Sequence, residues 1–141
     1  MLRMARFPPN RVEIRRWFAD HRREWRLGEA YRFGVEREGK LIGLVDIDEI
    51  DAAWGELGYW FEATAWGQGY ASEAAQAVVR FAFKEVGLLG LRSGHVEDNA
   101  ASRNVLLKLG FREVDTVRAK SRSRKEDVTQ HRYELRSSLD N

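Results

Sequence analysis

The feature that most constrains the fold is a change of hydrophobic period near the middle of the chain. From residue 72 onward, apolar side chains recur every three or four positions and polar ones fill the opposite face, which predicts an amphipathic helix over Ser72–Val86. Three runs rich in aliphatic and aromatic residues precede it, at 31–35, 41–47 and 54–61, with a polar turn expected at 48–53. Because short turns join these neighbouring strands, they should be antiparallel, with the helix packed on their sheet.

The rest of the chain continues the alternation of strands and helices, without an internal repeat or a linker. Capping and glycine signals mark where its helices begin and end. The expected elements are a helix at 11–27, a strand at 91–96, a helix at 99–109, and strands at 111–117 and 128–135. Residues 1–141 are therefore expected to form one domain, a mixed sheet flanked by helices with an α/β (α+β) architecture.

Composition excludes several functional classes. The chain has no cysteine, which rules out disulfides, thiolate zinc sites and thiol catalysis. Its three histidines, His21, His95 and His131, lie far apart without metal-ligand spacing, so no metal is expected. No apolar run approaches the ~20 residues of a membrane helix, and the start lacks a secretion signal. A cytoplasmic protein without a membrane partner is expected.

The net charge of +2 conceals an acidic segment between basic ends. Residues 38–73 carry one lysine against eight acidic residues, a net charge of −7, whereas residues 1–37 carry a net +5. The acidic segment is either an ordinary solvated face or a region that attracts a cationic ligand. Basic ends around an acidic middle form no continuous footprint for nucleic acid, which is therefore not an expected partner.

A glycine-rich loop lies directly before the strongest helix. It consists of Trp66, Gly67, Gln68, Gly69, Tyr70, Ala71 and Ser72. Glycines let the backbone turn tightly, and the free N–H groups of a helix's first turn favour an anion such as phosphate. The loop is not a P-loop, because no Gly-Lys-Ser/Thr follows it, and it lacks the third glycine of a dinucleotide fingerprint. A phosphate site and a plain glycine turn both remain open.

Two polar residues follow the strand expected at 91–96. Asn99 and Ser102 have the spacing of a helix-capping pair. The same residues can offer a ligand a side-chain amide and a hydroxyl proton at the end of a strand, where ligands usually bind in such sheets. The spacing alone does not separate capping from ligand binding.

A glutamate lies within the strand expected at 54–61. Alternation along the strand places Glu56, Gly58 and Trp60 on one face and Leu57, Tyr59 and Phe61 on the other. Partial burial raises the pKa of a carboxyl toward the range useful for a general base. An exposed or ion-paired glutamate is the alternative interpretation.

Taken together, these segments resemble the GNAT acyltransferase superfamily, in the branch that contains the ribosomal-protein N-terminal acetyltransferases. The matching pieces are LIGLVDI (41–47), GELGYWF (55–61), WGQGYASEA (66–74), FAF (81–83) and DNAASRNVLLKLGF (98–111), and the resemblance covers most of residues 8–135. It implies a GNAT-like mixed, mostly antiparallel central sheet flanked by helices. The family's first strand and helix have no counterpart here, so either a homodimer partner that covers the sheet, an unusually open acceptor site or a start farther upstream is expected.

The resemblance also implies a cosubstrate and roles for individual residues. Acetyl-coenzyme A is the implied donor, bound by Tyr59, Trp60, Phe61, Trp66, Gly67, Gln68, Gly69, Tyr70, Ala71, Ser72, Asn99 and Ser102. Many members carry a tyrosine seven residues after the asparagine, where this chain has Leu106. Ser102 is implied as the substitute proton donor for the leaving thiolate, and Glu56 as the base that deprotonates the acceptor.

The implied reaction moves the acetyl group from acetyl-coenzyme A to a primary amine by direct attack. The acceptor is expected to be a peptide N-terminus or a small amine, since a protonated amine suits the acidic segment 38–73. Two alternatives belong to other classes: a protein that binds coenzyme A without turnover, and a nucleic-acid or protein interaction module that uses the arginine-rich stretch 11–26.

Overall fold

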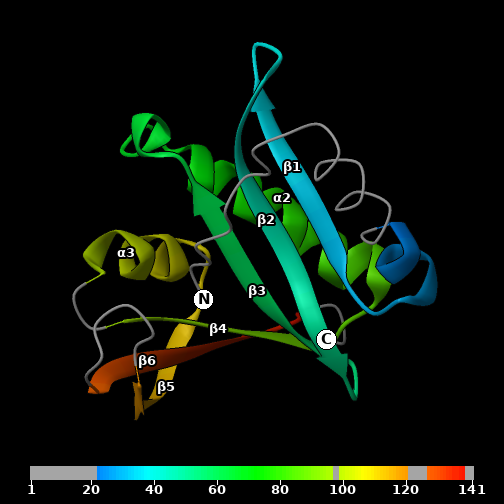
Figure 1. Ribbon diagram of the computed structural model, residues 1–141. Coiled ribbons are helices and arrows are strands. Elements are labelled where there is room, and N and C mark those ends of the chain that lie inside the picture. The colour runs from blue at the N-terminus through cyan, green and yellow to red at the C-terminus, as the bar shows by residue number, and fades with distance from the viewer. Residues whose placement is uncertain (1–21, 97–98, 121–126, 139–141) are drawn as a thin grey trace.

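A computed structural model describes residues 22–96, 99–120 and 127–138. Its strands form one six-stranded sheet in the order β1-β2-β3-β4-β6-β5, flanked by helices (Figure 1). The strands are β1 (Tyr31–Arg37), β2 (Lys40–Asp51), β3 (Trp54–Phe61), β4 (Gly90–Val96), β5 (Arg112–Lys120) and β6 (Asp127–Arg136). The helices are a short one at 22–27, a 3-10 turn (Ala63–Ala65), α2 (Tyr70–Phe81), a π-helical turn (Ala82–Val86) and α3 (Ala100–Lys108). The expected mixed, mostly antiparallel sheet with flanking helices is confirmed.

The sheet divides between its two central strands. β1, β2 and β3 form the expected antiparallel meander, and β4, β6 and β5 form a second antiparallel set. β3 and β4 are parallel, and only residues 54–56 of β3 pair with residues 90–92 of β4. Beyond these three pairs the two strands diverge, as Figure 1 shows. The divergence opens space beside the C-terminal half of β3.

Helices α2 and α3 pack on the same face of the sheet. Val45 and Ile47 of β2 are register partners of Tyr59 and Leu57 of β3, so these four side chains share one face. The core that covers this face also includes Ala75, Val78 and Val79 of α2, Leu106 of α3, and Leu91 and Tyr133 of the second strand set. Each fully buried aliphatic side chain contributes about 1.5–3 kcal/mol to stability.

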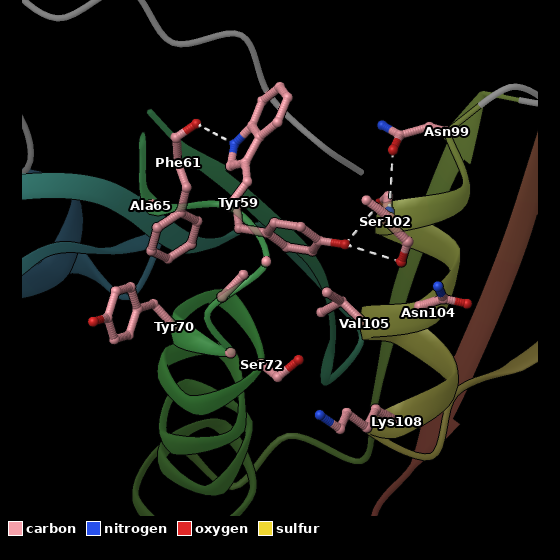
Figure 2. A pocket seen from close by; sticks show the side chains of 15 residues that line it. Tyr59, Phe61, Ala65, Tyr70, Ser72, Asn99, Ser102, Asn104, Val105 and Lys108 are labelled. Atoms are coloured by element: carbon pink, nitrogen blue, oxygen red, sulfur yellow. Dashed lines mark hydrogen bonds between the residues drawn. The ribbon is translucent and has the colours of Figure 1, made fainter. Parts of the chain in front are cut away.

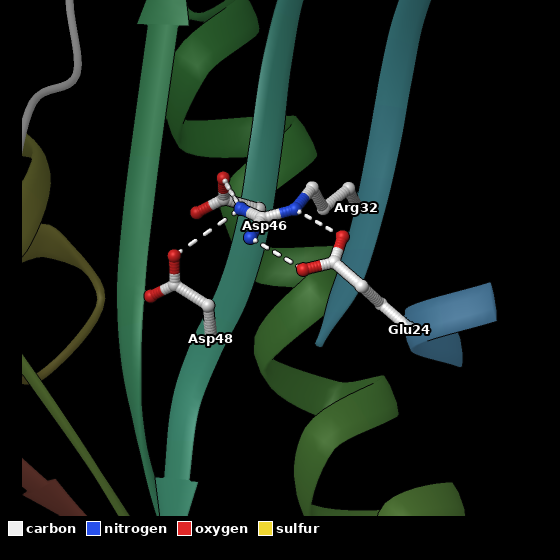
Figure 3. A network of polar contacts seen from close by, with 4 residues as sticks. All are labelled: Glu24, Arg32, Asp46 and Asp48. Carbon is white, nitrogen blue, oxygen red and sulfur yellow. Dashed lines mark hydrogen bonds and ion pairs between the residues drawn. The ribbon is translucent and has the colours of Figure 1, made fainter. Parts of the chain in front are cut away.

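The end of β2 differs from the sequence prediction. The polar turn expected at 48–53 is wrong over residues 48–51, because β2 continues to Asp51. The Arg32 guanidinium explains this, since its Nη1 donates to Asp46 at 2.7 Å and to Asp48 at 3.2 Å (Figure 3). Both carboxylates are buried, and a second arm of Arg32 pairs with Glu24 from the helix at 22–27. Ion pairing therefore keeps a polar run inside a strand.

Helix boundaries agree with the predicted caps and differ in detail. α2 begins two residues before Ser72 and gives way at Ala82 to the π-helical turn, which hydrophobic periodicity does not distinguish from α-helix. Asn99 is the N-cap of α3, and Gly110 follows that helix with a φ of +96°, both as predicted. The expected helix at 11–27 is helical over 22–27, and its earlier residues lie outside the described part. Within the described residues, no helix is long and apolar enough to cross a membrane.

Two histidines that are distant in sequence are neighbours in space. β4 and β6 pair His95 with His131, and their rings stack with centroids 5.0 Å apart. Their separation in the sequence does not reveal this contact, because sheet register brings together residues of different strands. His95 also contacts the Tyr133 hydroxyl at 3.0 Å, and His131 contacts Glu113 at 3.1 Å. Among the described residues, no group of three possible ligands forms a metal site.

Candidate active site

A cavity of about 610 Å³ fills the space where β3 and β4 diverge. One wall is the end of β3, a second is the glycine loop with the start of α2, and a third is α3 (Figure 2). Ten of the predicted cofactor residues line it: Tyr59, Phe61, Trp66, Gly67, Gly69, Tyr70, Ala71, Ser72, Asn99 and Ser102. The sheet topology thus brings together three segments that are separate in the sequence.

The glycine loop presents main-chain donors to this cavity. Gly67 and Gly69 have φ angles of +76° and +81°, and a Cβ on either would meet no atom within 4 Å. These glycines are therefore needed for their backbone conformation, not for lack of space. The first backbone bond of the helix runs from the Glu73 N–H to the Gly69 carbonyl at 3.0 Å. The N–H groups just before Glu73 precede intrahelical bonding and can bind an anion.

Two loop side chains fasten the loop to its surroundings. The Trp66 indole N–H donates to the Phe61 carbonyl at 2.8 Å, although the residue as a whole is 64% exposed. The Gln68 side-chain amide donates to the Thr64 carbonyl at 2.9 Å and does not line the cavity. The side chain of Gln68 therefore holds the turn, which leaves its backbone as the group that can serve a ligand.

Asn99 and Ser102 make the capping bond that their spacing predicts. The Ser102 backbone N–H donates to the Asn99 Oδ1 at 3.1 Å. The nitrogen of the same Asn99 side chain points away from this bond (Figure 2). Capping and ligand binding are therefore compatible, because the cap uses the oxygen and leaves the amide N–H groups to a ligand.

A buried pair of hydroxyls joins β3 to α3. The Tyr59 hydroxyl lies 2.7 Å from the Ser102 Oγ and donates to the Ser102 carbonyl at 3.2 Å (Figure 2). Both residues are buried. Burial raises the pKa of Tyr59 to about 12, and the bond to Ser102 offsets only part of that effect. Tyr59 thus stays protonated at neutral pH and remains able to hydrogen-bond with the Ser102 hydroxyl.

The sequence prediction missed the residues that α3 contributes beyond Ser102. Asn104 and Lys108 both line the cavity, and the Lys108 side chain points across it toward Ser72 at the start of α2 (Figure 2). Lys108 therefore adds a cation opposite the helix N-terminus. Asn104 and Lys108 are four residues apart, so they lie on the same face of the helix. This spacing was the available signal in the sequence, but it indicates a binding role only when that face is known to border a cavity.

Glu56 lies on the opposite face of β3 from Tyr59, as alternation predicts. It lines a second cavity of about 270 Å³ together with Arg92, Arg132 and Glu134. Burial raises the pKa of Glu56, and a hydrogen bond shared with Glu49 raises it further. Glu56 is thus half-buried and poised to accept a proton above the usual pH range of a glutamate.

Trp60 and Gln68 are the two predicted cofactor residues that do not line the larger cavity. Alternation places Trp60 on the same face of β3 as Glu56. Trp60 can therefore take part in cofactor binding only through its main chain. The same holds for Gln68, whose side chain is hydrogen-bonded to Thr64.

A divided sheet, with a glycine loop leading into a helix at the division, defines the class of this protein. The chain belongs to the GNAT acetyltransferase family, since its residues 1–112 match the acetyltransferase (GNAT) domain. The match agrees with the family that the motifs at 41–47, 55–61, 66–74 and 98–111 indicate.

Two curated relatives make the comparison more specific. The chain is 33% identical over 91 residues to the uncharacterized N-acetyltransferase YoaA of Bacillus subtilis (strain 168), over 62% of this chain and 51% of that protein. It is 31% identical over 86 residues to the ribosomal-protein-serine acetyltransferase of Escherichia coli (strain K12), over 60% of this chain and 48% of that protein. The chain thus spans about half the length of these relatives. The second relative agrees with the predicted ribosomal-protein acetyltransferase-like branch.

A solved structure supports the fold independently. The microcin C7 self-immunity acetyltransferase MccE, solved in complex with acetyl-CoA and AMP, has a TM-score of 0.78 to this chain at 17% identity. The alignment covers 91% of this chain and 73% of that one. At this identity the likeness concerns the fold alone. In MccE, the same fold binds acetyl-CoA.

Proposed function

We propose that this domain transfers the acetyl group of acetyl-coenzyme A to a primary amine. The observation that carries the proposal is the 610 Å³ cavity at the division of the sheet, which combines a helix N-terminus, a strand end and buried hydroxyls. Membership of the GNAT family supports the same reaction class. An N-acetyltransferase is therefore the function that site and family favour together.

The cavity residues suit the parts of acetyl-coenzyme A. The N–H groups of residues 69–72 would bind the diphosphate, with Lys108 as a cation on the opposite wall. The Asn99 amide and the main chain of residues 59–61 would bind the pantetheine arm. When bound, acetyl-coenzyme A supplies a thioester whose carbonyl carbon is open to attack by an amine, with a thiolate as the leaving group.

The two faces of β3 have separate roles in the proposed reaction, one toward the acceptor amine and the other toward the leaving thiolate. Glu56 takes a proton from the acceptor ammonium, directly or through water, which frees the nitrogen lone pair. On the other face, the Ser102 hydroxyl donates a hydrogen bond to the departing thiolate and so stabilises its charge, while the Tyr59 hydroxyl, 2.7 Å away, holds the Ser102 Oγ in place. The Tyr59–Ser102 pair would thereby do the work of the family tyrosine that Leu106 replaces.

The acceptor face carries negative charge that favours a cation. Asp48 and Glu56 are register partners on β2 and β3, and Asp46 lies two residues before Asp48 on the same face. Arg32 pairs with both aspartates, and Glu49 adds a further carboxyl group beside Glu56. We therefore propose a protonated primary amine, either a peptide N-terminus or a small amine, as the acceptor.

The proposal extends to a cytoplasmic homodimer. β1 and β5 are the two edge strands of the described sheet, and an edge strand can pair with a second chain. Light scattering at micromolar concentration should give twice the mass of the chain, whereas a monomer mass would contradict the dimer.

A thiol-release screen tests the reaction. Purified protein with acetyl-coenzyme A is offered peptides, polyamines, amino acids and aminoglycosides, alongside alcohols of matched size. The proposal predicts steady release of free thiol with at least one amine and none above background with the alcohols. Tight coenzyme A binding without release for any acceptor would favour a binding protein that lacks turnover. Release that follows the alcohols would contradict an amine acceptor.

A further inference from the structure

Arg92 occupies an unusual position in the 270 Å³ cavity that Glu56 lines. The register pairs it with Glu56 on β3 and with Glu134 on β6, so a carboxylate stands on either side. Nevertheless, in the described part of the chain Arg92 forms no ion pair with either one. Its guanidinium instead lies over the Trp54 ring, with Cζ 4.7 Å from the ring centroid.

The local sequence builds this position. Trp54 lies against Gly90, where a Cβ would come within 2.4 Å of the indole, so only glycine leaves room for the ring. The indole in turn supports one face of the Arg92 guanidinium through a cation–π contact. A guanidinium held by its face keeps its N–H groups at the edge, in the plane that binds a carboxylate with two parallel hydrogen bonds.

The other basic groups of the same cavity already have partners. Arg132 donates from Nε to Asp115 at 2.6 Å, and His131 contacts Glu113 at 3.1 Å. Of the cavity's arginine and histidine side chains within the described residues, Arg92 is therefore the cation whose hydrogen-bonding edge remains for a ligand. Since Glu56 lines the same cavity, a ligand there meets a carboxylate and a guanidinium together.

We propose that Arg92 binds a carboxylate of the acceptor while Glu56 receives its amine, so that the acceptor is an amine with a carboxylate close to it. This inference rests on the proposed function. The shared chemistry belongs to a free amino acid and to a peptide with an acidic side chain next to its N-terminus. The neighbouring register positions of Glu56 and Arg92 suit these groups, because adjacent strands lie about 4.8 Å apart.

Matched pairs of acceptors test this inference. Glycine is compared with glycinamide, and the peptide Ser-Asp-Ala-Ala with Ser-Asn-Ala-Ala, both peptides C-terminally amidated. KM and kcat are measured by thiol release, and Kd by calorimetry with coenzyme A present. The acidic member of at least one pair should have a KM and a Kd about tenfold lower than its neutral partner, as expected for loss of a hydrogen bond to a charged group. The pair that shows the difference identifies the source of the carboxylate.

Three variants locate the effect. Arg92→Gln should abolish the preference while KM for acetyl-coenzyme A changes less than twofold, and Arg92→Lys should restore it only in part. Arg136 is the matched control, because its Cζ lies 5.3 Å from the same Trp54 ring yet it does not line the cavity. Arg136→Gln should keep the preference in full.

The outcomes separate this inference from the proposed function. No preference in the wild-type protein, or one that survives Arg92→Gln, overturns the role of Arg92. A preference lost equally in Arg136→Gln also overturns it and points to packing around Trp54. A binding preference that depends on Arg92, found without any turnover, would support the carboxylate site and contradict the acetyltransferase.

Discussion

At the scale of single residues, the hydroxyl pair of Tyr59 and Ser102 is the feature most closely tied to the proposed chemistry. Neither residue alone resembles the family's usual acid, a tyrosine at the position of Leu106. Together they form a buried donor chain, because the Tyr59 hydroxyl lies 2.7 Å from the Ser102 Oγ. The sequence prediction assigned Ser102 this role and gave Tyr59 only a cofactor contact. Their proximity could not be foreseen, since 43 residues separate them.

Removal of either hydroxyl should slow turnover without loss of the cofactor. Ser102→Ala and Tyr59→Phe should each lower kcat by about ten- to a hundredfold, with little change in KM for acetyl-coenzyme A. The double variant should be no slower than the worse single one, because the two hydroxyls act as one chain. Tyr133→Phe is the control, since that buried hydroxyl contacts His95 instead. Full activity of Ser102→Ala would remove the pair from the mechanism.

Glu56 makes a prediction about pH. Its pKa is raised by burial and by the bond to Glu49, so wild-type kcat/KM should fall on acidification at a pH above that of an ordinary glutamate. Glu56→Gln should lower kcat/KM most at low and neutral pH. The deficit should shrink as rising pH deprotonates the acceptor amine itself.

Glu49→Gln provides the matched comparison for Glu56. It removes the hydrogen bond and the neighbouring charge that raise the pKa of Glu56, so the acid limb of the pH profile should move to lower pH. A profile for Glu56→Gln that matches the wild type at every pH would contradict the assignment of the base.

At the scale of elements, the glycine loop and α2 form the unit that the sequence predicts best. The loop residues stand in order before a periodic helix, so local pattern alone predicts a glycine turn and a helix N-terminus there, with an anion site as one of two interpretations. What pattern could not supply is the opposite wall, which includes Lys108 from a separate helix. The extension of β2 was missed for a similar reason, because Asp48 appears polar in sequence while Arg32, sixteen residues away, pairs with it.

A substitution at Gly69 tests the backbone conformation of the loop without a steric clash, because a Cβ there would meet no atom within 4 Å. Gly69→Val places a branched side chain at a φ of +81°, a conformation that costs about 1–2 kcal/mol for L-residues. The loop should shift and the Kd for acetyl-coenzyme A should rise at least tenfold by calorimetry. Gly39→Val is the control, at a φ of +78° in the turn between β1 and β2 and also in open space. It should cost similar stability and leave binding unchanged, so equal losses of binding would contradict the loop's role.

At the scale of the whole molecule, local signals predict which helices and strands form, whereas long-range strand pairing determines how they are arranged into a sheet and a cavity. The bounds of β3 and the Asn99 cap follow from alternation and capping chemistry. The division of the sheet does not, because it depends on β3 and β4 pairing over only three positions. The stacking of His95 on His131 likewise exists only after β4 and β6 are in register.

The central claim is that the cavity at this division binds the acetyl donor, and a crystal structure of the protein soaked with coenzyme A tests it most directly. The account predicts diphosphate density within hydrogen-bond distance of the N–H groups of residues 69–72, opposite Lys108, with the thiol end near Ser102. Ordered coenzyme A density at any other place on the molecule, with this cavity empty, would contradict the account.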